Sequence, residues 1–151
     1  MAISELIQEK NLMAHLEAKN RTQAYRQMIE HLVAQQLLPQ DLLDPAEKAL
    51  QVREDKMTTA MGGGFAIPHA TLPKLKQLAT LLARCPSGLD CQAVDGKPVK
   101  LFFLILVPAD QAQLHLQTLA TVAKFFNRRG IKTRILEAKE PAEILQLFQS
   151  N

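Results

Sequence analysis

The chain has 151 residues, a net charge of +3 and an apolar fraction of 47%, which suits one domain, residues 1–151, with a single sizeable core. No apolar run reaches the roughly 18 residues of a transmembrane helix, and the N-terminus lacks the basic start and apolar run of a signal peptide. We therefore expect a cytoplasmic protein without direct membrane insertion, in which Cys85 and Cys91 stay reduced. Positive charge gathers at residues 124–139 with few aromatic residues and no nucleic-acid motif, so we expect a solvated surface and no nucleic-acid binding.

The first third of the chain has typical helix starts. Local patterns predict a short helix at residues 4–7, an apolar segment and candidate edge strand at 11–16, and helices at 21–36 and 46–53. Asn20 can cap the first long helix, and Asp44 followed by Pro45 is a typical start for the second. His15 and His31 have no neighbouring carboxylate, cysteine or histidine at ligand spacing, so we interpret both as structural.

The segment Met61–Pro73 contains three consecutive glycines, Gly62 to Gly64, followed by a short apolar stretch, Pro68 and His69. Glycine reaches positive φ at little cost and lets backbone N–H groups approach a ligand, while proline holds the residue before it in extended geometry. The segment is therefore predicted to be a glycine loop that leads into a strand ending at His69. Its N–H groups and the imidazole could bind an anion or phosphoryl group; the alternative is a hairpin turn with a capping histidine.

The second half of the chain alternates strands and helices. The patterns predict a strand at 78–83, turns at 86–88 and 95–96, a central strand at 99–107, a helix at 111–127, a strand at 133–137 and a helix at 142–148. The segment 99–107 is almost continuously apolar, as a strand covered on both faces should be. Helical spacing gives the next helix an apolar stripe formed by Leu116, Leu119, Ala120, Ala123 and Phe126. Beside that stripe is His115, in the opening turns, where the helix dipole favours a neutral imidazole.

This order of elements predicts an α/β fold: a sandwich of one mixed β-sheet with helices on both faces, in a single domain. Ligands in such folds bind beyond the strand ends. His69 and the helix bearing His115 each follow a strand directly, so we expect the two imidazoles to meet at one rim. Arg53, sixteen residues before His69, could reach them and bind phosphate through its planar fork; the alternative is a surface ion pair with Glu54 or Glu47.

Several motifs resemble those of a known family. Arg53-Glu54, Thr58-Thr59 and Gly62-x-Gly64-x-Ala66-Ile67-Pro68-His69, followed by the strand at 101–107 and His115-Leu116-Gln117-x-Leu119-Ala120, stand in one order along the chain. This pattern resembles the enzyme IIA domains of the phosphoenolpyruvate-dependent sugar phosphotransferase system, type 2. That class covers the fructose and mannitol proteins and the nitrogen-regulatory IIA proteins.

The resemblance implies a phosphohistidine carrier and gives a role to each matching residue. His69 would accept a phosphoryl group on Nε2 from the phosphocarrier protein HPr, His115 would hydrogen-bond that group, and Arg53 would be the supporting cation. The group would then pass to a IIB component for uptake of a fructose- or mannitol-like sugar. In the nitrogen-regulatory branch, the phosphorylation state would instead control binding to a regulated protein.

The sequence departs from the family pattern at Gly63, where asparagine is usual, and at Ala70, where glycine is usual. Alanine at positive φ would be strained, so either the loop differs or the φ of Ala70 is negative. We expect no metal or cofactor, and the absence of a Gly-Lys-Ser/Thr motif argues against a kinase that uses ATP. A metal-dependent hydrolase built on His69 and His115 is a further alternative, which lacks carboxylates at ligand spacing.

Overall fold

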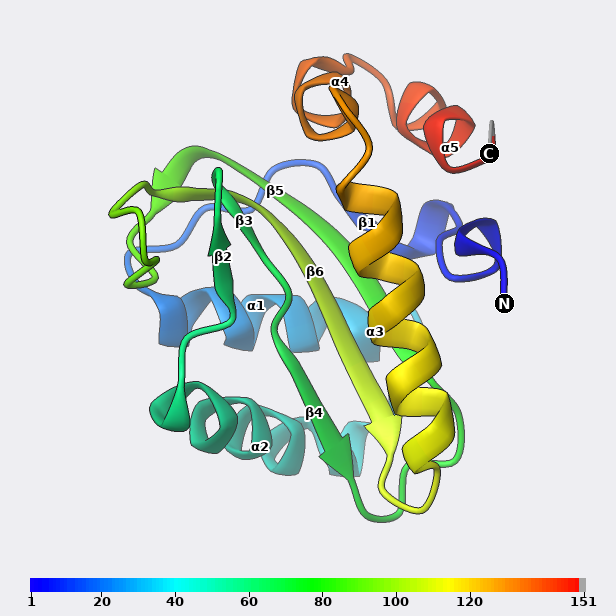
Figure 1. The fold of residues 1–151 in the computed structure, drawn as a ribbon. Coiled ribbons are helices and arrows are strands. Elements are labelled where there is room, and N and C mark those ends of the chain that lie inside the picture. The colour runs from blue at the N-terminus through cyan, green and yellow to red at the C-terminus, as the bar shows by residue number, and fades with distance from the viewer. Residues whose placement is uncertain (150–151) are drawn as a thin grey trace.

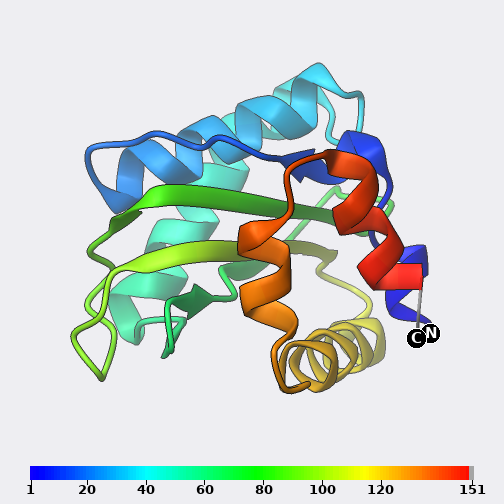
Figure 2. The ribbon, with the colours of Figure 1, turned by 90° about the horizontal axis from the view of Figure 1, so that it is seen from above.

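One mixed β-sheet separates two layers of helices (Figure 1; Figure 2). The computed structural model describes residues 1–149. Its strands are β1 (Leu12–Met13), β2 (Ala60–Gly62), β3 (Phe65–Ala66), β4 (His69–Leu72), β5 (Ala79–Leu89) and β6 (Val99–Pro108). Its α-helices are α1 (Arg21–Ala34), α2 (Leu43–Lys56), α3 (Ala112–Phe126), α4 (Ile131–Glu137) and α5 (Pro141–Gln149), with short 3-10 turns at Ile3–Glu5, Glu9–Asn11 and Gln40–Leu42. The predicted α/β sandwich is confirmed.

The sheet is built around β6, as its apolar sequence predicts. The strand order is β1-β5-β6-β3-β2, and β4 also pairs with β6. β3 and β4 follow one another along the same edge of β6, where Phe65 is in register with Leu101 and His69 with Ile105. On its other side β4 pairs with no strand in the part of the chain that the structure describes. The strand that begins with His69 therefore borders an open edge of the sheet.

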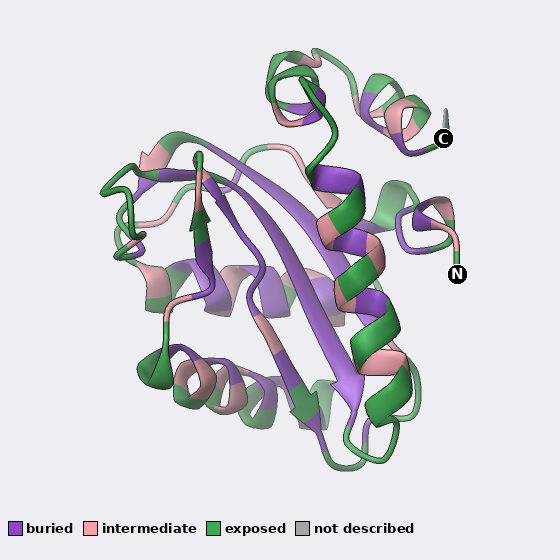
Figure 3. Ribbon diagram, in the orientation of Figure 1, coloured by how far each residue is buried: buried purple, intermediate pink, exposed green. Residues whose placement is uncertain are grey.

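Two apolar clusters hold the layers together, and β6 contributes to both. Alternate residues of a strand point to opposite faces, so Phe102, Leu104 and Leu106 pack with α1 and α2. Phe103 and Ile105 pack instead with α3, α4 and α5. All five side chains are fully buried. Figure 3 shows nearly all of β6 as buried, and its one exposed residue is Lys100 near its start. The two clusters thus fix α2 and α3 on opposite faces of the same strand.

Most of the predicted helices and strands are present, with ends that differ by a few residues. Asn20 caps α1 as expected, because its side chain accepts a 2.8 Å hydrogen bond from the N–H of Gln23. β1 is an edge strand, and α5 opens at Pro141. α2 is longer than the predicted 46–53 because Leu43 adds a buried contact at its start and the helix continues to Lys56.

The strand predicted at 133–137 is wrong, because those residues belong to α4. Gly130 adopts a left-handed conformation (φ 79°) and starts the helix. Ile131 and Ile135, four residues apart, both face the core, which is the spacing of one helix face. The turn predicted at 86–88 is also wrong, since it lies inside β5, where Gly88 (φ 78°) accompanies a register shift.

The apolar stripe predicted for α3 is right at Phe126, which is buried, and at Leu119, which packs half-buried against the core, but it is wrong at Leu116. Leu116 is 68% exposed. The helix instead buries Thr118, Val122, Phe125 and Phe126. The Thr118 side chain can lie inside because its hydroxyl donates a 2.7 Å hydrogen bond to the carbonyl of Leu114. Position 116 is consequently free to face outward, beside His115.

Candidate functional site

His69 is the first residue of β4, so the prediction of a strand that ends at His69 is wrong. The backbone just before His69 fixes the orientation of its ring. The ring Nδ1 lies 2.7 Å from the carbonyl oxygen of Ile67. A carbonyl can only accept, so Nδ1 carries the hydrogen and Nε2 keeps its lone pair in the neutral ring. Pro68 favours extended geometry at Ile67, which places that carbonyl beside the ring. The local sequence therefore presents Nε2 as the free nucleophilic atom.

His115 reaches the same place from α3. The ring centroids of His69 and His115 are 5.5 Å apart, with the planes at 51°, so the prediction that the two imidazoles meet is confirmed. Nδ1 of His115 is buried and has no hydrogen-bond partner among the described residues. Buried polar atoms are rarely left unsatisfied. The ring of His115 therefore keeps one polar atom that no described residue satisfies.

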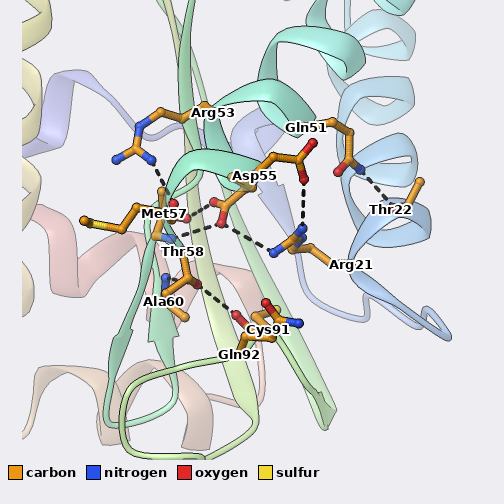
Figure 4. A network of polar contacts seen from close by, with 12 residues as sticks. Arg21, Thr22, Gln51, Arg53, Asp55, Met57, Thr58, Ala60, Cys91 and Gln92 are labelled. Carbon is orange, nitrogen blue, oxygen red and sulfur yellow. Dashed lines mark hydrogen bonds and ion pairs between the residues drawn. The ribbon is translucent and has the colours of Figure 1, made fainter.

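Arg53 lies in the last turn of α2 and faces the same groove. Its Nη1 donates a 2.8 Å hydrogen bond to the carbonyl of Met57, as Figure 4 shows. Within residues 1–149 it forms no ion pair with Glu54 or Glu47, so the alternative of a surface ion pair is wrong. The bond to Met57 closes the end of α2 and leaves other N–H donors of the guanidinium available.

The three side chains line one groove of about 570 Å³, above the open edge of β4 and between α2 and α3. This volume is in the usual range for sites that bind small groups. The groove is lined by Pro45, Lys48, Ala49, Val52, Arg53, Lys56, His69, Ala70, Thr71, Leu72, Pro73 and His115. The lining contains three cationic side chains of lysine and arginine and no carboxylate, which suits an anion.

The surroundings of His69 favour the neutral imidazole. Burial lowers the pKa of His69 below its ordinary value, and the positive charge of Arg53 and the neighbouring His115 lower this pKa further. The carbonyl of Ile67 acts in the opposite direction on the pKa and does not outweigh burial. His69 is therefore neutral near pH 7, in the form that can attack an electrophile.

Glu54 has a structural role in this region that the sequence analysis did not predict. It is 5% exposed and joins α2 to β2, because its carboxylate accepts hydrogen bonds from both the N–H and the hydroxyl of Thr59. Arg21 of α1 lies 3.8 Å from the same carboxylate. Figure 4 shows Arg21 with its ion pair to Asp55, in the same region as Arg53. The sequence signal for this role was the presence of both Glu54 and Thr59 in the motif, because helical periodicity gives neither residue a reason to be there.

The glycines are not part of the groove, which corrects the expectation that their N–H groups could hold a phosphoryl group there. They form the turn between β2 and β3, and the N–H of Gly63 donates a 2.8 Å hydrogen bond to Asp95. The carbonyl of Gly64 pairs with the start of β6, whereas His69 is in register with Ile105 farther along. The hairpin turn is thus the correct alternative for the glycines. Ala70 lies in β4 and is absent from the residues with positive φ, so its departure from the family pattern carries no strain.

Residues 1–149 contain no group of three or more histidine, cysteine, aspartate or glutamate side chains arranged to hold a metal ion. None of the helices in the same range combines the length and apolar character needed to cross a membrane.

Residues 5–151 match the family described as phosphoenolpyruvate-dependent sugar phosphotransferase system, EIIA 2. A nitrogen regulatory protein of Bradyrhizobium diazoefficiens is 33% identical over 98% of this chain and 95% of its own length. A fructose-specific EIIA component of Haloferax volcanii is 38% identical, and the match covers 64% of this chain and 62% of that protein. The crystal structure of the nitrogen regulatory protein IIA-Ntr from Neisseria meningitidis superposes with a TM-score of 0.86 at 25% identity, covering 97% of this chain and 98% of that one. The chain therefore belongs to the type 2 enzyme IIA family of the sugar phosphotransferase system.

Proposed function

We propose that this protein is a phosphohistidine carrier in which Nε2 of His69 accepts a phosphoryl group and later gives it up. The observation that carries the proposal is the geometry of the histidine pair. Nδ1 of His69 is held by the carbonyl of Ile67 at 2.7 Å, and His115 lies 5.5 Å away, centroid to centroid. One nitrogen is thus free to attack, and a second ring borders the place where the phosphoryl oxygens would lie.

Phosphoryl transfer asks little covalent chemistry of the protein and depends mainly on position and charge. In the transfer step, the phosphorus–nitrogen bond of a phosphohistidine donor breaks as the lone pair of Nε2 forms a new one. The donor imidazole leaves as a neutral ring, and Nδ1 of His69 keeps its hydrogen. His115 would donate a hydrogen bond to a phosphoryl oxygen, and Arg53 would add a positive charge at the groove wall. No metal or cofactor is needed for such an exchange between imidazoles.

The rim of the groove suits a protein donor. Val52 on α2 and Leu116 on α3 are 48% and 68% exposed, which gives an apolar contact on each side of the histidine pair. Lys48 and Lys56 stand exposed around the same opening. An HPr-type phosphocarrier would dock across α2 and α3. Where the surface of that carrier is basic, the two lysines would repel it, so apolar contact would have to dominate there.

Two roles are distinguished by what happens to the phosphoryl group after it is bound to His69. In the first, the phosphoryl group passes to a IIB component for uptake of a fructose- or mannitol-like sugar. In the second, phosphorylated and free forms differ in their binding to a regulated protein. The nearly full-length match to a nitrogen regulatory protein supports the second role. The fructose-specific relative supports the first.

The test is incubation of the purified chain with phosphoenolpyruvate, enzyme I and HPr, followed by intact mass measurement. We expect one phosphoryl group on the wild type and none on His69→Gln. His115→Ala should still take up the group but transfer it onward more slowly. His31→Gln, which changes a histidine outside the groove, is the matched control and should behave as the wild type. Phosphorylation of His69→Gln at the wild-type rate would refute the assignment. Restored sugar phosphorylation in an extract lacking IIA would then favour the first role, and phosphorylation-dependent binding to a non-transport protein the second.

A further inference from the structure

A second groove, of about 680 Å³, lies along β1, at the edge of the sheet opposite to β2. Residues of α1 form one wall, and residues of α5 form the other. None of its lining residues takes part in the groove of the histidine pair. Its volume is in the range of small-molecule sites, and no role for it follows from the proposed phosphoryl transfer.

Arg84 of β5 reaches this groove with an unusual set of contacts. The residue is only 7% exposed. Its Nη1 donates to the carbonyls of Ile135 and Ala138 at 3.1 and 2.6 Å, and its Nε donates to the carbonyl of Ala14 at 3.3 Å. No carboxylate of residues 1–149 forms an ion pair with it, although a buried guanidinium normally has a counter-charge.

The remaining nitrogen of this guanidinium, Nη2, has no hydrogen-bond partner among the described residues. It is also absent from the fully enclosed polar atoms that lack a partner, so this nitrogen is accessible, and Arg84 is one of the residues that line the groove. Two N–H donors on a charged, otherwise fixed group therefore point to an acceptor that the described residues do not supply. Because the guanidinium is charged and planar, these donors suit an oxyanion.

The rest of the lining adds positive charge and an apolar floor. Lys10 is exposed at the rim, and the Nε2 of His31 lies 3.0 Å from the carbonyl of Lys10, to which it donates. Glu9, the one carboxylate among the lining residues, is exposed and has no ion pair in the described part of the chain. The half-buried side chains of Leu12 and Met13 supply accessible apolar surface.

We propose that this groove binds a small organic carboxylate. The carboxylate accepts hydrogen bonds from Nη2 of Arg84 and lies near the ammonium group of Lys10. Its hydrocarbon part covers Leu12 and Met13. Inorganic phosphate shares the charge but has nothing to place on the apolar floor, so the groove should prefer the carboxylate. A purely structural role for Arg84, closing the end of α4, would use Nη1 and Nε and leave Nη2 without purpose.

The experiment is a titration of the isotope-labelled full chain with acetate, butyrate and inorganic phosphate, followed by amide chemical shifts, with chloride as the salt control. We expect saturable shifts for residues around β1 and the start of α5, and tighter binding of butyrate than of acetate by roughly fourfold per buried methylene. Phosphate that binds more tightly than butyrate would overturn the carboxylate assignment. Shifts that are scattered over the surface or do not saturate would overturn the site.

Variants separate the groove from unspecific anion binding. Arg84→Lys keeps the charge but loses the planar fork, and should weaken butyrate binding by more than about tenfold. Because this variant also loses the bonds to the carbonyls, Met13→Glu gives a second test: it places a negative charge on the half-buried lining of the groove and should abolish binding. Lys19→Gln, an exposed lysine outside the groove, is the matched control and should bind like the wild type. Unchanged binding in Met13→Glu would refute the proposal.

Discussion

Replacement of Glu54 by alanine should destabilise the protein strongly, although the residue lies on a helix next to a surface arginine. Glu54 is 5% exposed, and its carboxylate accepts two hydrogen bonds from Thr59, so Glu54→Ala leaves a buried N–H and a buried hydroxyl without their acceptor. It also leaves Arg21 without the carboxylate 3.8 Å away. Removing one side of such a buried, charged set costs about 3 to 5 kcal/mol.

Urea unfolding followed by circular dichroism measures this loss as a lower midpoint at constant slope. Asp55→Ala is the matched control, because Asp55 lies 3.8 Å from the same Arg21 but its side chain is 71% exposed. An exposed pair contributes less than about 1 kcal/mol, so the control should stay near the wild type. If Glu54→Ala and Asp55→Ala lower the free energy of unfolding by the same small amount, the buried carboxylate does not hold α2 to β2 and this reasoning is wrong.

Three further outcomes follow from burial and backbone geometry. Because burial lowers the pKa of His69, its contribution to the free energy of unfolding should be complete above about pH 6.5 and lost as pH falls through the lower folded-state pKa. The rate of single-turnover phosphorylation should fall with the same low pH midpoint. A pH midpoint above about 6.5 would contradict this prediction. Gly88→Ala should cost about 1 to 3 kcal/mol, because its new Cβ would lie 2.9 Å from Pro98, whereas Gly96→Ala, with a similar φ and no atom within 4 Å, should cost less in the same urea assay. Phe126→Ala should cost about 3 to 5 kcal/mol in urea unfolding, since its ring packs against four other phenylalanines. A smaller loss would show that the core collapses into the cavity.

The parts of the fold that the sequence predicts correctly are those whose pattern has one solution. The segment 99–107 is apolar at nearly every position, and only a central strand buries both of its faces. The cap at Asn20 and the proline at 141 likewise leave little choice for the helices that follow. The meeting of His69 and His115 could be predicted because His69 comes shortly after β3 and His115 shortly after β6, and these two strands are paired in one sheet.

The errors lie where a short pattern has two solutions. The composition of residues 133–137 suits a strand. The segment forms a helix because the turn at Gly130 places both Ile131 and Ile135 toward the core. On α3, apolar residues stand on more than one face, and packing against α4 and β6 selects the face of Val122 over that of Leu116. Three glycines in a row suit an anion loop and a hairpin equally well; the hydrogen bond from Gly63 to Asp95, thirty-two residues away, decides between them.

The site also shows why its parts depend on both layers of the sandwich. Arg53 belongs to a helix packed in the cluster on one face of the sheet, and His115 belongs to a helix packed in the cluster on the other. His69 stands between them because β4 pairs with β6, the strand whose alternate side chains enter both clusters. The spacing of the three groups is therefore set by the thickness of the sheet and its two cores, since no hydrogen bond or ion pair joins these side chains to one another within residues 1–149. A cavity on either face should thus disturb phosphoryl transfer at a distance, while a surface change on either helix should mainly alter docking.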